Sequence, residues 1–248
     1  MRLSKILIPA SAAALIAGPA YAMAAEPVST LGIIVAADKY KVKSDNDDID
    51  GRDENLGKAG VFYNYGNKMT GGPGTIFEIG ANARYGDKDD NKVKDARADL
   101  DLGLRMPLTD HSNFDVLVGA GYDWSRFEAE GNVADVEVSN KSPFAKAAVG
   151  WHHQSDTLTT RLEVGTRYSI KGKGKVKLVD VGSESADLKD TYSPYAELNF
   201  LWDRGHAFPL SAGVYYTQTN YELKNKRMLA DNTKLESNEF GVKLGVAF

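Results

Sequence analysis

Long segments in which apolar and polar residues alternate strictly constrain the fold of this chain more than any other feature. In the segment 95–106, DARADLDLGLRM, apolar residues occupy every even position, and charged residues or glycine occupy every odd position. A period of two is typical of a β-strand with one apolar and one polar face. In a soluble sandwich the apolar face would be core, whereas in an outer-membrane barrel it would meet lipid, so one strand does not decide between these folds.

Ten segments alternate in this way, and their lengths favour strands that cross a membrane. Most are about 10 to 14 residues long, whereas strands of soluble proteins are usually nearer 5 or 6 residues. Crossing ~25 Å of apolar membrane at a tilt of ~40° and ~3.3 Å per residue takes about 10 residues. The first segment is the least regular, because Asp38 falls on its presumed lipid face. The segments are approximately 30–42, 57–66, 75–86, 95–106, 114–127, 143–152, 158–171, 191–202, 210–223 and 235–248.

The connections between these segments are of two kinds. Four are compact and rich in Gly, Pro, Asn and Asp, which suits tight turns: NKMTGGPG, PLTDHSN, HQSDT and DRGHAFP. The others are mostly longer and more charged, such as SDNDDIDGRDEN and GKGKVKLVDVGSESADLK. Short periplasmic turns and long extracellular loops are the arrangement of outer-membrane barrels. An even number of strands then places both ends of the barrel on the periplasmic side.

Aromatic residues on the apolar faces gather near both ends of the segments, and the middles are Ala, Val and Leu. Two such rings suit a surface that faces lipid, because Tyr and Trp have an apolar body and a polar tip. A soluble sandwich has no reason to place them so. The predicted periplasmic ring contains Tyr63, Tyr65, Phe77, Phe114, Trp151, Phe200, Trp202 and Phe248, and the predicted outer ring contains Tyr85, Tyr122, Trp124, Tyr168, Tyr192 and Tyr216.

The last segment, NEFGVKLGVAF, alternates up to a final Phe. A closed barrel pairs its last strand with its first and leaves no free edge. At this point the sequence resembles bacterial outer-membrane β-barrel proteins of the small, porin-like kind. The resemblance implies an all-β fold, a single antiparallel transmembrane barrel of about 10 strands (about 8 to 12 fit the pattern), in the bacterial outer membrane. It also implies that the last apolar row is the signal read by the barrel assembly machinery, here Phe240, Val242, Leu244, Val246 and Phe248.

The start of the chain has the features of an export signal. It carries Arg2 and Lys5, then an apolar stretch, then AYA, which is the order of a secretory signal peptide. We expect a cleaved signal peptide 1–22, a short periplasmic segment 23–29 and a barrel 30–248; an uncleaved membrane anchor is the alternative. No later run approaches the ~20 apolar residues of a spanning helix, and the chain has no cysteine. A formal net charge of −4 argues against nucleic-acid binding.

Charged residues on the faces opposite the apolar ones would point into the barrel. Acidic and basic side chains with this parity are nearly equal in number. Unpaired charges in a narrow lumen of low dielectric cost several kcal/mol each, so we expect them to pair. Side chains nearly fill barrels of about 8 to 10 strands, and we therefore expect a salt-bridged lumen in a monomer. The residues of this predicted lumen charge network are Asp95, Arg97, Asp99, Asp101, Arg105, Arg161, Glu163 and Arg167.

The segment KGKGKVKL places a lysine at every second position after Arg167. If the inward parity continues, Lys171, Lys173, Lys175 and Lys177 form a basic ladder at the outer mouth that attracts anions. If the hairpin twists outward, the same lysines touch lipopolysaccharide phosphates instead. A solvated hairpin with acidic partners is the simpler alternative.

Three other patterns suggest chemistry, and each has a simpler structural explanation. WHHQSD places His153 and Ser155 on one strand face and faintly resembles the His-x-Ser-Asn motif of outer-membrane lipid hydrolases, but Asp156 stands in place of the Asn. NDDIDG at 46–51 matches only the first half of a calcium-binding loop. All four histidines fall in predicted short turns, which are ordinary places for His. We therefore expect no catalytic residue, no cofactor and no metal.

These features together predict a non-enzymatic, porin-like or structural envelope protein, with at most a narrow channel for small solutes. Its expected partners are outer-membrane lipid, lipopolysaccharide and the assembly machinery. One alternative is a surface adhesin that binds its ligand through the charged extracellular loops. A lipid hydrolase acting through His153 and Ser155 is a weaker alternative.

Overall fold

The computed structural model describes residues 26–43, 53–88, 91–129, 136–178, 182–202, 208–222 and 234–248. The predicted signal peptide, the calcium-like pattern at 46–51 and His206 lie outside these residues. In the described part of the chain, no helix is long and apolar enough to span a membrane.

Every regular element of the described residues is a β-strand. The strands are β1 (Val28–Lys43), β2 (Asp53–Gly66), β3 (Gly74–Lys88), β4 (Asn91–Pro107), β5 (Ser112–Ala129), β6 (Val136–Gln154), β7 (Leu158–Ser169), β8 (Lys173–Leu178), β9 (Gly182–Asp187), β10 (Tyr192–Trp202), β11 (Leu210–Glu222) and β12 (Lys234–Ala247).

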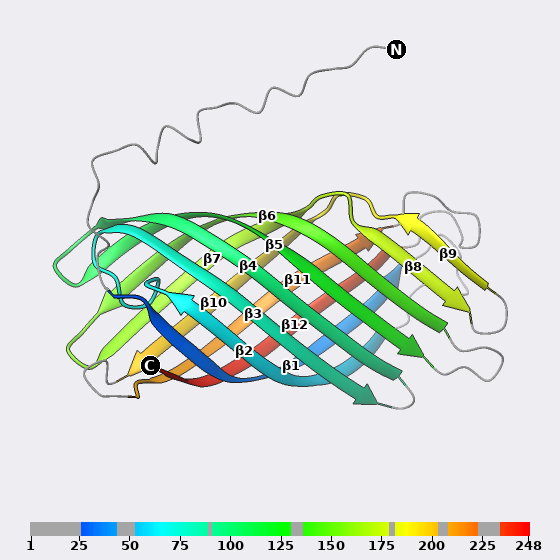
Figure 1. The fold of residues 1–248 in the computed structure, drawn as a ribbon, viewed down its shortest axis with the longest axis horizontal. Helices are drawn as coiled ribbons and strands as arrows, with labels where there is room; N and C mark the ends of the chain where they lie inside the picture. Colours follow the sequence, from blue (N-terminus) through cyan, green and yellow to red (C-terminus); the bar gives the residue numbers. More distant parts are fainter. Residues whose placement is uncertain are drawn as a thin grey trace, which may run out of the picture.

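All of these strands except β8 and β9 close into one antiparallel barrel (Figure 1). Chain neighbours pair from β1 to β7, then β7 pairs with β10, and the order continues through β11 to β12. The barrel closes because β12 pairs with β1, from Thr30 opposite Ala247 to Lys43 opposite Lys234. The predicted all-β transmembrane barrel of about 10 strands is confirmed.

The short strands β8 and β9 form a hairpin that extends the barrel wall at the end opposite to the C-terminus (Figure 1). β8 pairs with the first residues of β6, from Val136 to Lys141, whereas β7 pairs with the later part of the same strand. The predicted segment 158–171 therefore ends earlier, at Ser169. Lys171 has a φ of 49°, a left-handed conformation that few residues other than Gly adopt, and it interrupts the strand.

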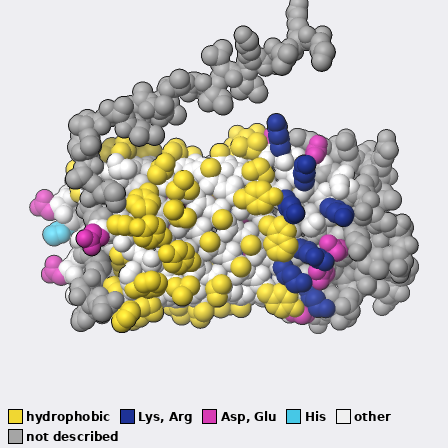
Figure 2. Space-filling model, in the orientation of Figure 1, with side chains coloured by type: hydrophobic (Ala, Val, Ile, Leu, Met, Phe, Trp, Pro, Cys, Tyr) yellow, Lys and Arg dark blue, Asp and Glu magenta, His cyan; other side chains and the backbone are white. Residues whose placement is uncertain are grey.

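The outer surface of the barrel is an apolar belt. On β1 the side chains of Leu31, Ile33 and Val35 are more than half exposed although they are aliphatic. Figure 2 shows hydrophobic side chains across the middle of the visible face and charged side chains at both of its ends. An apolar surface of this extent requires lipid around it.

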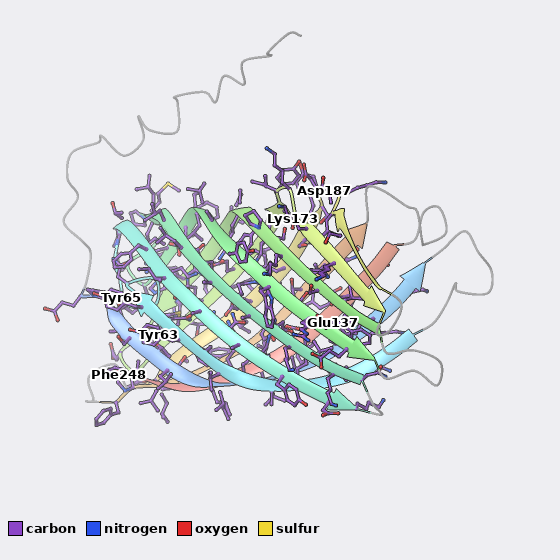
Figure 3. All side chains as sticks on the ribbon, turned by 45° about the vertical axis from the view of Figure 1, so that its right-hand side comes forward. Tyr63, Tyr65, Glu137, Lys173, Asp187 and Phe248 are labelled. Atoms are coloured by element: carbon purple, nitrogen blue, oxygen red, sulfur yellow. The ribbon has the colours of Figure 1, made fainter. Side chains whose placement is uncertain are left out.

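The two predicted aromatic rings lie on this outer surface. At the periplasmic end, Tyr63, Tyr65 and Phe248 are exposed and point away from the barrel (Figure 3). At the other end Tyr85 and Tyr122 are exposed in the same way. The residues of the predicted assembly signal also face outward and are 38% to 60% exposed: Phe240, Val242, Leu244, Val246 and Phe248.

Candidate functional site

The inside of the barrel is lined by charged side chains, which makes the lumen the candidate functional site. Each member of the predicted lumen charge network points inward and is at least partly buried. Further charged side chains join them, among them Asp38 and Lys68, which the alternation did not place in the lumen. The eight predicted residues are Asp95, Arg97, Asp99, Asp101, Arg105, Arg161, Glu163 and Arg167.

At the periplasmic end, four residues form a continuous chain of buried ion pairs. Arg105 donates to both carboxylate oxygens of Asp115, from Nε at 2.7 Å and from Nη2 at 2.8 Å. One of these oxygens lies 3.0 Å from Nη2 of Arg161, which also donates from Nη1 to Glu163 at 2.6 Å. The side chains of Arg105, Asp115 and Arg161 have no exposed surface. Each charge in the chain therefore depends on its partner, because an unpaired charge at this depth is costly.

The turn between β2 and β3, residues 67–73, occupies this end of the lumen, and we call it the turn plug. Arg105 donates to the carbonyl of Lys68 at 2.7 Å and to the carbonyl of Gly71. The side chain of Asn67 is fully buried and hydrogen-bonds to two backbone groups of β3, at 2.8 and 3.1 Å. The turn plug is therefore fastened to the barrel wall by several independent contacts.

Lys68 extends from the turn plug into the lumen. Its Nζ lies 2.7 Å from Glu78, 2.9 Å from Asp101 and 3.3 Å from Glu163. Burial lowers the pKa of Lys68, but these carboxylates outweigh the effect of burial and raise the pKa well above its usual value. Lys146 shares two of the three carboxylates, at 2.6 Å from Asp101 and 3.1 Å from Glu163. The charged turn plug is thus part of one ion-pair network with the barrel wall.

A second cluster lies nearer the extracellular end. Nζ of Lys58 lies 2.8 Å from Asp38 and 2.9 Å from Asp95, and it also pairs with Glu239. Arg84 pairs with Asp95 at 2.5 Å and with Glu239. The placement of Asp38 on the lipid face is therefore wrong: it is 2% exposed and lies inside, because the odd-numbered residues of β1 are the ones that meet lipid.

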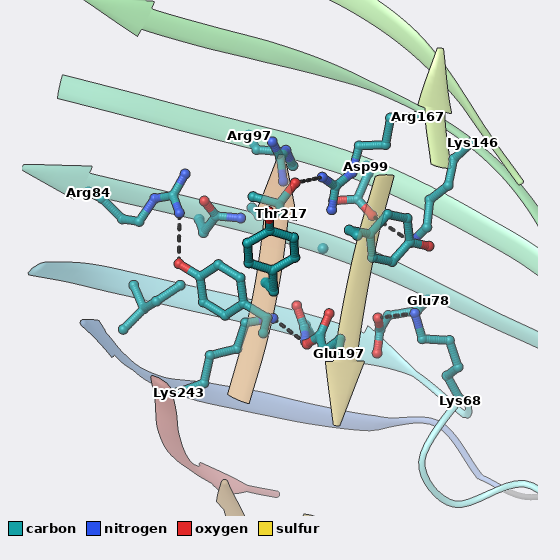
Figure 4. Close-up of a pocket in the computed structure, with 18 residues that line it drawn as sticks. Lys68, Glu78, Arg84, Arg97, Asp99, Lys146, Arg167, Glu197, Thr217 and Lys243 are labelled. Atoms are coloured by element: carbon teal, nitrogen blue, oxygen red, sulfur yellow. Dashed lines mark hydrogen bonds and ion pairs between the residues drawn. The ribbon is translucent and has the colours of Figure 1, made fainter. Parts of the chain in front are cut away.

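A cavity of about 60 Å³ lies in the lumen among these ion pairs (Figure 4). On its walls, Arg97 donates to Asp123 at 2.5 Å, and Lys243 donates to Glu197 at 2.5 Å. A space of this size holds a few water molecules, and ion-paired side chains line it. The charged lining residues are Lys68, Glu78, Arg84, Arg97, Asp99, Lys146, Arg167, Glu197 and Lys243.

The prediction that the lysines of 171–177 continue the inward parity is wrong. Lys173 and Lys175 are exposed, whereas Gly172 and Gly174 are buried. The cause is the left-handed residue Lys171, which shifts the alternation by one position between β7 and β8. The side chain of Lys177 lies outside the described residues, but its backbone, opposite Glu137, has the same parity as Lys173.

The lysines of β8 instead belong to a patch on the outer surface, which we call the basic band. Lys173 stands opposite Lys141 of β6, and Lys141 stands opposite Trp124 of the outer aromatic ring. Arg126 pairs with Glu128 at 2.7 Å and with Glu137 at 2.9 Å, so acidic residues partly balance the band. Figure 2 shows Lys and Arg side chains directly beyond the hydrophobic belt. The band consists of Lys92, Lys94, Arg126, Lys141, Lys173 and Lys175.

The side chains proposed for hydrolysis have structural partners. Nδ1 of His153 hydrogen-bonds to Oγ of Ser112 at 2.9 Å, and its ring stacks on Trp151. Oγ of Ser155 donates to the carbonyl of Leu158 at 3.0 Å within its own turn. In the described ranges, no group of three or more His, Asp or Glu side chains is arranged to hold a metal ion.

Comparison with known proteins places the chain among barrels of this kind. The family model described as outer membrane protein beta-barrel domain matches residues 10–191, well over half of the chain. No curated protein matches the sequence.

Solved structures align with most of this chain at low sequence identity. The outer membrane protease OmpT from Escherichia coli is 9% identical, with a TM-score of 0.55 over 90% of this chain and 95% of that chain. The translocator domain of the autotransporter NalP from Neisseria meningitidis is 13% identical, with a TM-score of 0.41 over 86% and 87% of the two chains. OprG from Pseudomonas aeruginosa is 12% identical, with a TM-score of 0.34 over 91% and 97%. At these identities the likeness to OmpT concerns the fold alone.

Proposed function

The chain belongs to the family of outer membrane β-barrel proteins, and from that premise we propose a non-enzymatic role in the bacterial outer membrane. The protein is porin-like or structural, and it passes small solutes slowly if at all. The observation that carries this proposal is the turn plug, which Arg105 and Lys68 hold inside the periplasmic end of the lumen.

The ion pairs above the turn plug support the same function. A solute that crosses the barrel has to pass the cluster of Lys68, Asp101 and Lys146 and then the cluster of Lys58, Asp95 and Glu239. The cavity among these pairs, about 60 Å³, holds a few waters but no sugar or amino acid of ordinary size. Passage therefore requires ion pairs to open, which makes it slow and selective for small solutes.

A swelling assay with refolded protein in liposomes tests this function. We expect arabinose and glycine to enter slowly, and a disaccharide to enter no faster than it enters protein-free liposomes. Rapid entry of the disaccharide would contradict an occluded lumen. If no solute enters and cells instead bind a surface polymer through the long loops of this protein, the adhesin alternative replaces the channel.

We also propose that the basic band contacts the phosphate groups of lipopolysaccharide. The band lies immediately beyond the outer aromatic ring, at the level where lipid head groups begin. Lys141, Lys173 and Lys175 are exposed on the outside of the wall, and lysines near an anionic lipid surface are attracted to it. Two acidic residues lie near these lysines and offset part of their charge. Asp187 stands opposite Lys173 on the β8–β9 hairpin, and Glu137 lies on the end of β6 that pairs with β8 (Figure 3).

A further inference from the structure

One cation of the central cavity differs from all the others in its partners. Five of the six cationic side chains on the wall pair with a carboxylate: Lys68, Arg84, Arg97, Lys146 and Lys243. The sixth, Arg167, has no carboxylate within 4 Å among the residues that the structure describes. Its guanidinium donates from Nη1 to Oγ1 of Thr217 at 3.1 Å.

Two aromatic rings make cation–π contacts with the guanidinium of Arg167. It lies over the ring of Tyr195, with Cζ 4.3 Å from the ring centroid, and 6.0 Å from the centroid of Phe144. Contacts of this kind orient a guanidinium and lower the cost of burying it, but they bring no negative charge. A guanidinium has five N–H donors, and the contact with Thr217 uses one of them.

A second guanidinium stands next to this one. Cζ of Arg97 lies 5.9 Å from the centroid of the same Phe144 ring, and Figure 4 shows Arg97 and Arg167 close together at one end of the cavity. Arg97 is paired with Asp123, and Asp99, which also lines the cavity, lies 3.9 Å from Lys146, so Arg167 is the cation of this corner without a carboxylate partner of its own among the described residues. Asp123 and Asp99 offset part of the positive charge, and the remainder attracts an anion to the free side of Arg167, because the low dielectric of a confined lumen screens its field little.

We propose that this corner of the cavity is a binding site for a small oxyanion, a carboxylate or phosphate group held by Arg167 and steered by Arg97. The unused N–H groups of a guanidinium fork match the two oxygens of such a group. The cavity, about 60 Å³, accepts the anion in place of a few waters and excludes larger molecules. The contacts with Tyr195 and Phe144 orient the guanidinium.

Calorimetric titration of the refolded, lipopolysaccharide-free protein with inorganic phosphate, and separately with acetate, tests the proposal. The wild type binds at least one of the two, with chloride as the reference anion. Arg167→Gln weakens that binding by about ten- to a hundredfold, the range of a hydrogen bond to a charged group. Arg167→Lys keeps the charge but loses the fork, and it gives an intermediate affinity. This second variant also carries the test if Arg167→Gln does not fold.

The matched control is the double variant Lys173→Gln, Lys175→Gln, which removes two positive charges from the outside of the wall and none from the lumen. It binds the oxyanion as the wild type does. If the control loses binding while Arg167→Gln keeps it, the anion sits on the basic band and the lumen site is wrong. The absence of binding to the wild type overturns the proposal as well. The readout is equilibrium binding, so the result does not depend on whether the barrel conducts.

Discussion

At the scale of single residues, a few fully buried charges decide how the lumen is closed. Asp115 has two arginine partners and no exposed surface, whereas Asp99 is partly exposed and lies 3.9 Å from its nearest cation, Lys146. The first is a structural ion pair, and the second is a charge on the wall of the cavity. The two carboxylates therefore contribute very differently to stability, although both point inward.

Replacement of Asp115 by Asn should lower the free energy of unfolding by about 3–5 kcal/mol, because two buried arginines lose their shared counter-charge. The matched change Asp99→Asn should cost less than about 1 kcal/mol. Urea unfolding of the barrel in lipid vesicles at neutral pH measures both. Equal costs would mean that the periplasmic ion pairs do not hold the barrel together.

The lipid face gives a second prediction at this scale. Leu100 is 43% exposed, and the residues opposite it on both neighbouring strands are Ile79 and Ala120. It lies between the aromatic rings, so Leu100→Arg should destabilise the barrel in vesicles by about 2–4 kcal/mol. Leu100→Met, which keeps the surface apolar, should change little. An arginine tolerated as well as the methionine would show that this face does not meet lipid.

At the scale of elements, the two features that decide the site were those that alternation could not predict. Long strands of period two give the barrel, its lipid face and its inward charges directly, because burial on one face fixes the register of every residue in a strand. The turn plug carries no such pattern: NKMTGGPG reads as an ordinary tight turn, and its single Lys was the only signal of a role in the lumen. The predicted inward orientation of the β8 lysines was wrong for a related reason. Lysine rarely adopts a left-handed conformation, so nothing in the sequence indicated that Lys171 would shift the alternation.

The outward orientation of β8 leads to a prediction about lipid. The double variant Lys173→Gln, Lys175→Gln should weaken binding of purified lipopolysaccharide about thirtyfold, since each lysine near an anionic lipid surface contributes about 1 kcal/mol. Asp187→Asn, which removes the acidic residue opposite Lys173, should strengthen it. Microscale thermophoresis in detergent gives both affinities. If the lysine variant binds as the wild type does, the basic band is only a solvated surface.

The same variant separates the outer wall from the lumen. Because Lys173 and Lys175 face away from the lumen, their replacement should leave the ion selectivity of any current unchanged. Reversal potentials under a salt gradient across a planar bilayer measure that selectivity. If the variant were more selective for cations than the wild type, these lysines would line the mouth of a channel, and their outward placement would be wrong.

At the scale of the whole molecule, the protein is a closed β-barrel with an apolar outer surface and a charged lumen. The ten strands satisfy one another's backbone groups around the full circle, so the lipid meets only side chains. Inside, ion pairs connect strands that are not neighbours in the sheet, as Asp115 on β5 and Arg161 on β7 do, and as Lys146 on β6 and Asp101 on β4 do. We therefore expect the same ion-paired residues to stabilise the barrel and to restrict passage through its lumen.

The single-channel conductance of the refolded protein in a planar bilayer tests this most directly, when the wild type is compared with Lys68→Ala. The wild type should give small and infrequent openings. Lys68→Ala frees the turn plug from Glu78, Asp101 and Glu163 and should give larger or longer openings, while Lys173→Ala, on the outer wall, should behave as the wild type does. A large and steady wild-type conductance that Lys68→Ala leaves unchanged would contradict the occluded lumen.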